Sequence, residues 1–465
     1  MRILRDPDRL LAEGLAAVRA QFSVPQGFAP PVMEAAVAAA ARRPTAHADR
    51  TDLHFVTLDP ASSTDLDQAF AIERADARVG ADLLLHYAIA DVAWFVADDD
   101  PLDREAWARG VTTYLPDGKA SLYPPALSEQ AASLLPDGPR PAVLLTVRIA
   151  ADGTVRLAGA ERALIRSRAK LAYETVRDAD LPDGFAELAA RIAAAEDRRR
   201  AARVDPPEQE VERDADGRFV LRFRPYSQAE TRNAALSLAA NLAVADALLA
   251  AKTGLFRVMA APDAEAEQRL RRTAEAFRIE WPAGMPLVQF ERRLDAARPD
   301  HAAFMLAIRR AGNGASYVPF RAGETPWHAA MAAPYAHATA PLRRLADRHV
   351  LQAVLAIAQG QPVPEPAAAA FTRLPATMAR TEQRASQVGR AVIDLAEAAL
   401  LAGLEGEQFP AMVTDVGEAG ARSQLCDLPV VARADAGGAL PGTLIRVRLD
   451  RADPVRRELR FARSG

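Results

Sequence analysis

The sequence predicts an α+β protein in which a mixed sheet with covering helices is followed by a small five-stranded barrel. Apolar and polar residues alternate in several segments between residues 53 and 165, which is typical of strands. From residue 229 to about residue 404 helical periodicity dominates instead. Beyond residue 405, short strands alternate with Gly, Asp and Pro turns in the rhythm of an OB barrel. Because 50% of the residues are hydrophobic, the chain can bury a large core.

Three units are expected along the chain. Residues 1–48 form a short helical N-terminal segment, whose second helix is opened by Pro30 and Pro31. Residues 49–404 form one α+β unit, with strands early and helices late. Residues 405–465 form the barrel.

Within the α+β unit, turn signals divide the strands. Alternation predicts strands at 53–59, 65–73, 81–96 and 142–165. Asp152-Gly153 divides the last of these into a hairpin, because this dipeptide favours a tight turn. Asp216-Gly217 predicts a second hairpin, and residues 173–203 are expected to be helical.

Charge and cysteine content limit the partners and the compartment. The formal net charge is −3, so the chain is not a globally basic nucleic-acid coat. The single cysteine, Cys426, excludes a disulfide framework and a Cys-rich zinc site, and fits a reducing cytoplasm. The charged N-terminus does not resemble a secretory signal, and the stretch 234–251 is too rich in alanine to span a bilayer. We therefore expect a cytoplasmic protein with no membrane partner.

Arginine supplies nearly all of the positive charge. Of the 58 cationic residues, only three are lysines, and codon bias is a sufficient explanation. Between residues 442 and 465, seven arginines, Arg446 and Arg448 among them, accompany three acidic residues, a local net charge of +4. This face of the barrel is either a phosphate track or a solvated surface with charge pairs along its strands.

The strongest chemical signal is the acidic segment Asp59-Pro-Ala-Ser-Ser-Thr-Asp65-Leu-Asp67-Gln68. Asp65 and Asp67 are two residues apart at the predicted start of a strand, so both should project from one face. Asp59 ends the preceding strand across a short loop, so the three carboxylates should converge. Hard oxygen ligands of this kind suit Mg²⁺ or Mn²⁺. The alternative is an Asp-rich turn that caps loop N–H groups.

A second cluster lies in YAHATAPLRRLAD. Pro341 suits the first turn of a helix, which would place Arg343 and Arg344 near a positive helix end, a good place to hold a phosphate. The alternative is a plain salt bridge between Arg343 and Asp347, four residues apart on one helix.

Together these segments resemble the RNase II / RNase R family of exoribonucleases. LDPASSTDLDQAFAI resembles the acidic loop of the family, and four further pieces follow in family order: YLPD with P-x-x-LS, RSRAKLAYETV, GLFRVMAAP and YAHATAPLRRLADR. The resemblance covers about residues 50 to 400 and implies an RNB catalytic domain with an α+β fold. The C-terminal barrel resembles the S-one type OB domain that follows it.

The resemblance implies a processive 3′→5′ hydrolytic exoribonuclease that releases nucleoside 5′-monophosphates from single-stranded RNA. Asp59, Asp65 and Asp67 would bind Mg²⁺ or Mn²⁺, with Asp67 the most sensitive position. Arg343 would stabilise the charge that develops on the phosphate. No obligate protein partner is implied. The RNA-binding residues would be Tyr114 and Tyr173 against the terminal nucleotides, Glu382 at the 3′ pocket, and Arg344, Arg446 and Arg448 on the backbone.

Departures from the family pattern leave a second hypothesis open. Gln68 stands where the family has a second adjacent aspartate, which predicts a weaker second metal site. Ala234 or Ala235 stands where the family has a Glu at the terminal base. Both changes fit an RNA-binding protein built on a catalytically impaired RNB scaffold. Residues 1–48 also lack the β pattern of the family's cold-shock domains, so we expect a wider RNA entrance.

Overall fold

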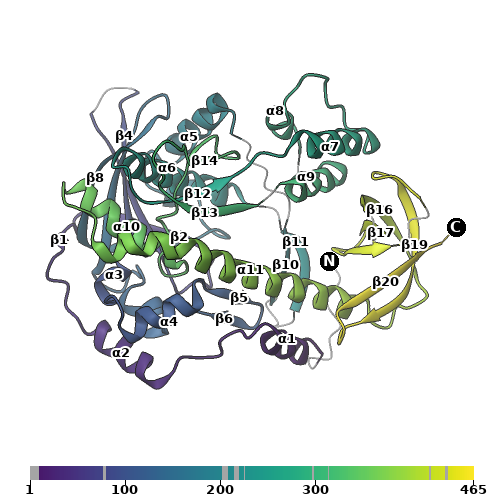
Figure 1. Cartoon of the computed structure of the whole chain (residues 1–465), viewed down its shortest axis with the longest axis horizontal. Helices are drawn as coiled ribbons and strands as arrows, with labels where there is room; N and C mark the ends of the chain where they lie inside the picture. Colours follow the sequence, from purple (N-terminus) through teal and green to yellow (C-terminus); the bar gives the residue numbers. More distant parts are fainter. Residues whose placement is uncertain are drawn as a thin grey trace.

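The structure of the protein, a computed structural model, describes residues 10–76, 80–201, 208–213, 219–224, 226–295, 298–312, 314–417, 420–434 and 438–464. Within these residues the chain forms a large mixed sheet, a smaller sheet, helices around both, and a closed barrel at the C-terminal end (Figure 1). The predicted α+β class with a five-stranded C-terminal barrel is confirmed.

The large sheet has the strand order β1-β8-β7-β4-β3-β2-β9. Its strands are β1 (Ala48–Asp49), β2 (Phe55–Asp59), β3 (Gln68–Arg74), β4 (Leu83–Ala90), β7 (Arg140–Ile149), β8 (Val155–Ile165) and β9 (Ser167–Ala172). Neighbours are antiparallel except for the outermost pairs, β1 with β8 and β2 with β9. The predicted turn between β7 and β8 is confirmed. Gly153 has a φ of +76°, and a side chain there would collide with the carbonyl oxygen of Arg191.

Helices that come later in the chain pack on this sheet. These are α5 (Phe185–Arg199), α6 (Gln228–Ala250) and α10 (Leu345–Ala358). A capping box between Ser227 and Glu230 begins α6, which contacts β7, β8 and α10. Contrary to our expectation for its sequence, α6 is long and apolar enough to be a candidate membrane span, yet 67% of its most apolar window is buried inside the fold, as in a core helix.

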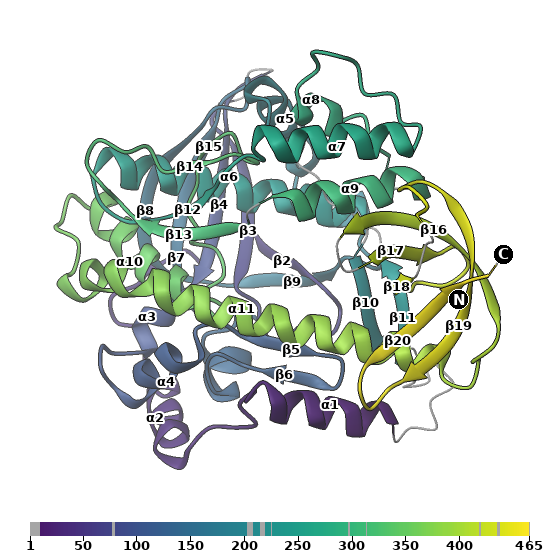
Figure 2. The ribbon, with the colours of Figure 1, turned by 45° about the vertical axis from the view of Figure 1, so that its right-hand side comes forward.

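The 37-residue helix α11 (Glu365–Leu401) crosses the molecule from α10 to the barrel (Figures 1 and 2). At 1.5 Å per residue it spans about 55 Å. Helix α1 (Leu10–Gln21) packs along its second half, where Leu15 and Val18 lie in one buried cluster with Leu395. Leu401, the last residue of α11, belongs to the core of the barrel. The long helix thereby joins the N-terminal segment, the sheet and the barrel.

The barrel and the smaller sheets complete the β structure. The barrel has the strand order β16-β17-β18-β20-β19, and the smaller four-stranded sheet has the order β13-β12-β14-β15. The bounds are β5 (Thr113–Leu115), β6 (Gly118–Ala120), β10 (Glu208–Arg213), β11 (Phe219–Arg224), β12 (Leu255–Met259), β13 (Ala315–Pro319), β14 (Trp327–His328), β15 (Ala333–Pro334), β16 (Gln408–Gly417), β17 (Gly420–Leu425), β18 (Val431–Ala434), β19 (Leu444–Asp453) and β20 (Glu458–Arg463).

The remaining helices are short. They are α2 (Pro30–Ala40), α3 (Val92–Phe95), α4 (Pro101–Arg109), α7 (Ala264–Ala276), α8 (Leu287–Glu291), α9 (Pro299–Ala311), the π-helix η1 (Leu127–Ala131) and the 3₁₀ turn η2 (Asp178–Asp180). The predicted unit boundary at 48/49 falls within β1, and the boundary at 404/405 falls between α11 and β16.

Several local expectations are wrong. Residues 92–95 form α3, because the Asp91 side chain caps them as a helix after β4 ends. Residues 173–184 are not α-helical, since α5 begins at Phe185, and β9 precedes them as a strand that the periodicity did not reveal. The smaller sheet lies in a region expected to be helical. The predicted turn Asp216-Gly217 lies outside the described residues, and the flanking strands β10 and β11 pair antiparallel.

Candidate active site

The acidic segment lies in the loop between β2 and β3. Asp59 is the last residue of β2, whereas Asp65 and Asp67 precede β3, which begins at Gln68. The expectation that both project from one face of a strand is therefore wrong. They belong to a loop that is anchored by Leu66, a fully buried side chain between them.

Arg343 lies in a turn before α10. The helix begins at Leu345 and its N-cap is Arg344, whose backbone is extended. Pro341 therefore does not occupy the first helical turn, and that prediction is wrong. The turn has this form because Asp347, in the first turn of α10, reaches back to bind the residues that precede the helix.

Asp347 binds Arg344 and not Arg343. Its carboxylate accepts the N–H of Ala340 at 2.8 Å and lies 3.0 Å from Nε and 2.7 Å from Nη2 of Arg344. The alternative of a plain salt bridge between Arg343 and Asp347 is therefore wrong. Since the Asp347 side chain has no exposed surface, the guanidinium of Arg344 is bound to the fold on one side.

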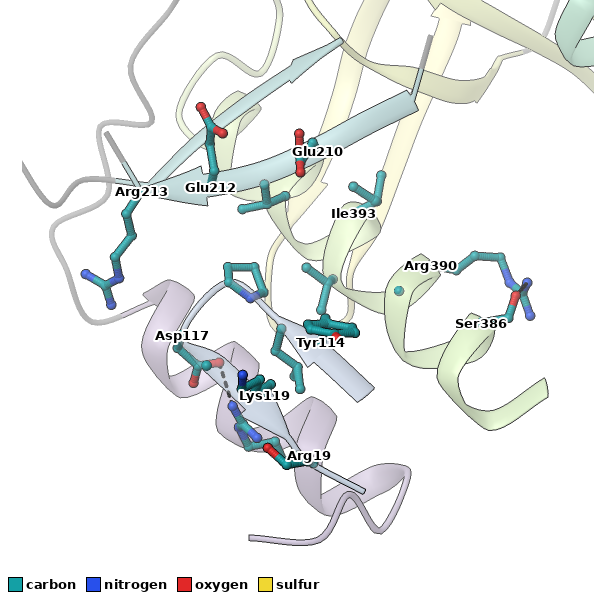
Figure 3. A pocket seen from close by; sticks show the side chains of 18 of the residues that line it. Arg19, Tyr114, Asp117, Lys119, Glu210, Glu212, Arg213, Ser386, Arg390 and Ile393 are labelled. Carbon is teal, nitrogen blue, oxygen red and sulfur yellow. Dashed lines mark hydrogen bonds and ion pairs between the residues drawn. The ribbon is translucent and has the colours of Figure 1, made fainter. Parts of the chain in front are cut away.

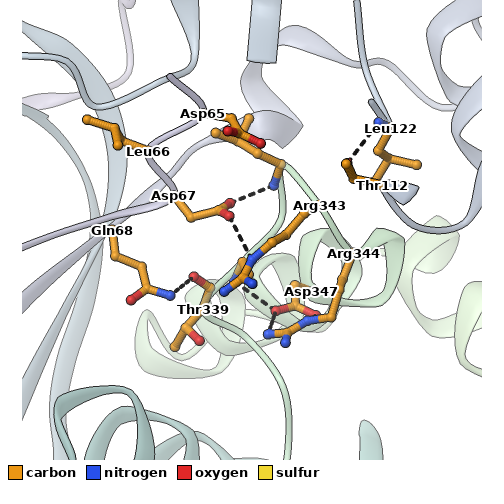
Figure 4. Close-up of polar contacts among 12 residues, drawn as sticks. Asp65, Leu66, Asp67, Gln68, Thr112, Leu122, Thr339, Arg343, Arg344 and Asp347 are labelled. Carbon is orange, nitrogen blue, oxygen red and sulfur yellow. Dashed lines mark hydrogen bonds and ion pairs between the residues drawn. The ribbon is translucent and has the colours of Figure 1, made fainter. Parts of the chain in front are cut away.

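Arg343 instead reaches the acidic loop (Figure 4). Its Nε lies 3.3 Å from Oδ2 of Asp67, and Oδ1 of Asp67 accepts the N–H of Leu342 at 2.7 Å. The Asp67 side chain is 7% exposed and that of Arg343 is 46% exposed. The two clusters that the sequence singled out separately thus form one site, with a buried carboxylate facing a guanidinium that is open to solvent.

Burial disfavours the charged forms of the carboxylates in the acidic loop. Loss of hydration raises the pKa of Asp67 to about 7, although the Arg343 charge and the N–H of Leu342 act against it. Loss of hydration also raises the pKa of Asp59 to about 6, again against Arg343. The Asp65 charge raises both pKa values further. The three carboxylates are therefore close enough to interact, and nearby positive charge stabilises them.

Lys119, which the sequence did not single out, supplies positive charge to Asp65. Its Nζ lies 2.6 Å from Asp65 Oδ1 and 3.1 Å from Glu129 Oε1. Lys170 lies beside the same loop, where its Nζ donates to the carbonyl of Ala61 at 2.9 Å. Two of the three lysines of an arginine-rich chain therefore flank the acidic segment. Lysine in place of arginine at these two positions is the feature of the sequence that could have pointed to them as site residues.

The donor set suits a hard divalent cation by its chemistry, because carboxylate oxygens are the ligands that Mg²⁺ and Mn²⁺ prefer. Among the described residues, no three Asp, Glu, His or Cys side chains are close enough together to hold a metal ion as they stand. Arg343 and Lys119 provide the positive charge that faces Asp67 and Asp65. A metal ion that binds this loop would therefore displace the side-chain cations of Arg343 and Lys119 from the carboxylates.

The amide of Gln68 is engaged within the protein. Its Nε2 donates to the carbonyl of Thr339 at 2.6 Å, and its Oε1 accepts the hydroxyl groups of Tyr87 and, at 3.2 Å, Ser237. Both ends of the amide thus have partners within the protein, and the weaker second metal site expected from Gln68 stays a prediction.

The two predicted aromatic residues both border the acidic loop. Tyr114 is 53% exposed, and its hydroxyl lies 3.4 Å from Asp65 Oδ2. The N–H of Tyr173 donates to the carbonyl of Asp59 at 3.2 Å, and its hydroxyl accepts Nδ2 of Asn233 at 2.7 Å. Both rings are therefore beside the candidate metal ligands.

Glu382, predicted at the 3′ pocket, lies on α11. Its Oε2 accepts Nη1 of Arg257 on β12 at 2.8 Å. The Arg257 guanidinium also stacks on the ring of Tyr317, 4.5 Å from its centroid. The negative charge of Glu382 is therefore neutralised by a partner that joins α11 to the smaller sheet.

A cavity of about 1980 Å³ is lined by residues of both the acidic loop and the barrel. Figure 3 shows the part of its wall around Tyr114 and Lys119. Asp65, Tyr114 and Lys119 line the cavity, and its walls also include residues of α1, the hairpins β5–β6 and β10–β11, α9, α11 and the barrel. Arg422 on β17 is the barrel cation in the wall, together with Arg310 of α9. The sequence did not single out these two arginines.

The predicted barrel arginines lie elsewhere. Arg446 and Arg448 are exposed on β19 and are not part of the cavity wall. Nη2 of Arg448 lies 2.9 Å from Asp450 Oδ1. Similar pairs join Arg451 to Asp453 and Arg460 to Glu458. The alternative of charge pairs along the barrel strands therefore describes much of this face.

The fold and the site define a recognised class of protein. The family model described as RNB domain matches residues 47–360, and the model described as RNase II-type exonuclease C-terminal S1 domain matches residues 407–464. The chain therefore belongs to the RNB-domain family. The predicted resemblance to RNase II and RNase R is confirmed.

Curated proteins are similar in sequence to parts of this chain. It is similar to ribonuclease R of Mycoplasma pneumoniae, with 29% identity over 325 residues, 64% of this chain and 44% of that protein. It is also similar to exoribonuclease 2 of Salmonella typhimurium, with 43% identity over 132 residues, 28% of this chain and 20% of that protein. The chain thus spans less than half the length of these relatives.

Solved structures show the same fold at low identity. Mycoplasma genitalium RNase R in complex with ribose-methylated single-stranded RNA matches with a TM-score of 0.86 and 20% identity, over 100% of this chain and 79% of that one. Yeast Ssd1, a pseudonuclease, matches with a TM-score of 0.70 and 15% identity, over 96% of this chain and 57% of that one.

Proposed function

We propose that this chain is a metal-dependent 3′→5′ exoribonuclease that degrades single-stranded RNA processively to nucleoside 5′-monophosphates. The observation that carries the proposal is the contact of Asp67 with Arg343, next to Asp65, which lines the cavity. Membership of the RNB-domain family supports it. So does the likeness to an RNase R that was solved with single-stranded RNA.

The residues of the chain would divide the work between charge stabilisation and binding. Asp59, Asp65 and Asp67 would hold Mg²⁺ or Mn²⁺. The chemistry that such an ion supplies when bound is polarisation of the phosphate and activation of water. Arg343, already half exposed, would turn from Asp67 towards the scissile phosphate and stabilise its developing charge, a contribution of about 10²- to 10³-fold in similar sites.

The cavity would bind the strand that is being shortened. Tyr114 presents an exposed ring beside the acidic loop, on which a base of the 3′ end would stack. Arg310 and Arg422 in the wall would contact phosphates further from the reacting end. An RNA strand that contacts the cavity wall both at Tyr114 and at these arginines stays bound between successive cleavages, which is the physical basis for processivity.

A second candidate function is RNA binding without cleavage. Two observations favour it: Gln68 stands at the last position of the acidic loop, and no metal-holding group is preassembled among the described residues. The likeness to a pseudonuclease shows that the fold itself is compatible with either function.

One experiment separates the two candidates. RNA labelled at its 5′ end is incubated with the full chain in Mg²⁺, in EDTA, and with the variant Asp67→Asn. Two results together support the exoribonuclease. The wild type shortens the RNA from its 3′ end in Mg²⁺ and not in EDTA. Asp67→Asn does not cleave the RNA, although its RNA affinity stays within a few fold of the wild type. Bound but intact RNA under every condition supports the impaired scaffold.

A further inference from the structure

Gln68 lies where the acidic loop meets the turn that carries Arg343. We call residues 338–344 the Arg343 turn. The amide of Gln68 has three partners, the carbonyl of Thr339 and the hydroxyl groups of Tyr87 and Ser237. Tyr87 and Ser237 also contact each other through their hydroxyl oxygens at 2.7 Å. The amide therefore joins β3 to the Arg343 turn, and β4 and α6 hold it from behind.

The partners determine which way the amide faces. A backbone carbonyl accepts hydrogen bonds and cannot donate them, so the group that faces Thr339 must be the NH₂ of Gln68. The Oε1 atom then faces the hydroxyl groups, which are able to donate. A carboxylate has no hydrogen to offer Thr339 and would place negative charge against its carbonyl oxygen. An amide suits this position, and an ionised acid does not.

Two consecutive residues set the distance between the Arg343 turn and the acidic loop. Gln68 holds the turn at Thr339, and Asp67 holds it three residues later through the N–H of Leu342. Further contacts join the turn to other elements, through Asn241 on α6 and Asp347 on α10, and the N–H of Thr112 donates to the carbonyl of Arg343 at 3.0 Å. Loss of the Gln68 contact therefore frees the Thr339 carbonyl on the side that faces the acidic loop.

We propose that Gln68 is a positioning residue, which holds Arg343 at its place beside the acidic loop through the hydrogen bond from its amide to Thr339. The glutamine at this position then has a positioning role in place of the metal-binding role of an aspartate, and it is not a sign of an impaired site. The proposal rests on the proposed function for its catalytic consequence, whereas the structural consequence is independent of it.

Gln68→Glu keeps the length of the side chain, removes the NH₂ donor and places a negative charge against the Thr339 carbonyl when ionised. We expect kcat for single-stranded RNA to fall about tenfold or more while KM changes less than about threefold, because small displacements of a charge-stabilising group are costly in the transition state and binding is spread over the cavity. Gln68→Asp should also lower kcat, and it should not reduce the Mg²⁺ concentration for half-maximal rate. The matched control is Gln359→Glu, the same chemical change at an exposed position where α10 ends.

A second measurement does not depend on activity. The backbone N–H groups of Ala338, Ala340 and Leu342 are all hydrogen-bonded within the fold. Hydrogen–deuterium exchange of peptides covering residues 335–345 should therefore be faster in Gln68→Glu than in the wild type and in Gln359→Glu, with peptides from α11 unchanged. If Gln68→Glu does not fold, Tyr87→Phe, which removes one donor to the amide oxygen, should show the same changes at smaller size.

Three outcomes would overturn the proposal. Wild-type kcat and wild-type exchange in Gln68→Glu would show that the amide positions nothing. A higher kcat or a lower Mg²⁺ requirement in Gln68→Asp would show that residue 68 belongs to the metal shell and lacks its charge. If Gln68→Glu does not fold, unchanged hydrogen–deuterium exchange and unchanged kcat in Tyr87→Phe would also overturn the proposal. Wild-type protein that leaves RNA intact would refute the exoribonuclease, while the exchange measurement would still decide the role of Gln68.

Discussion

Replacing Asp67 with asparagine should stabilise the metal-free protein at alkaline pH. The pKa of Asp67 is about 7 in the fold, against 3.8 for an ordinary aspartate, because burial costs the carboxylate its hydration. The fold therefore binds the Asp67 proton more tightly than the unfolded chain does. The stability of the wild type should fall as the pH rises from about 4 to about 7, and this loss is complete above the folded-state pKa.

The size of the effect follows from the same two pKa values. At about 1.4 kcal/mol for each tenfold change in proton affinity, ionising Asp67 costs the fold up to about 4 kcal/mol. The pKa of about 7 already includes the attraction of Arg343 and the hydrogen bond from Leu342, so neither is subtracted again. Asparagine keeps an oxygen acceptor for the N–H of Leu342. We expect Asp67→Asn to gain up to about 4 kcal/mol at pH 8 and close to nothing at pH 4.

Urea unfolding of both proteins in EDTA at several pH values measures this difference directly. Titrating groups that do not interact with Asp67 are common to both proteins and cancel in the comparison. The exposed Asp427→Asn, with no ion pair among the described residues, is the matched control and should follow the wild type at every pH. Mg²⁺ should reduce the advantage of Asp67→Asn by stabilising the wild-type carboxylate. A difference that does not vary with pH, or an Asp67→Asn protein less stable than the wild type at pH 8, would refute the reasoning.

Other parts of the site lead to further predictions. Arg343→Ala should slow cleavage about 10²-fold with RNA affinity nearly unchanged; if affinity falls and turnover of the bound complex does not, Arg343 only positions the RNA. Lys119→Met removes the cation that faces Asp65, so calorimetry should detect tighter Mg²⁺ binding than in the wild type or in the control Lys252→Met; equal or weaker binding would contradict the exchange of cations. Deleting residues 405–465 should weaken RNA binding and lower the slope of log K against log salt by about two to four, because several barrel arginines already have acidic partners. Equal slopes in the full and shortened chains would show that the barrel does not contact RNA.

The sequence by itself determined the features that depend on neighbouring residues. Alternating apolar residues predicted β3, β4, β7 and β8, and Asp152-Gly153 predicted the turn between the last two, because strand faces and tight turns are decided within a few positions. The rhythm of short strands after residue 405 predicted the closed barrel. Three aspartates around a short loop were enough to indicate the acidic cluster. Local patterns failed where a capping side chain outweighed periodicity, as Asp91 does before α3.

Only the tertiary structure decided which residues act together. The i, i+4 spacing favoured a pair between Arg343 and Asp347, yet Asp347 binds Arg344 because it caps the turn before α10, and this frees Arg343 to reach Asp67. The cation of Lys119 comes to Asp65 from a separate hairpin. Gln68 looked like a missing charge, and its role depends on a carbonyl 271 residues away along the chain. Sequence spacing reports neighbours along one element, whereas a hydrogen bond or an ion pair depends on distance in space, which the packing of the whole fold sets.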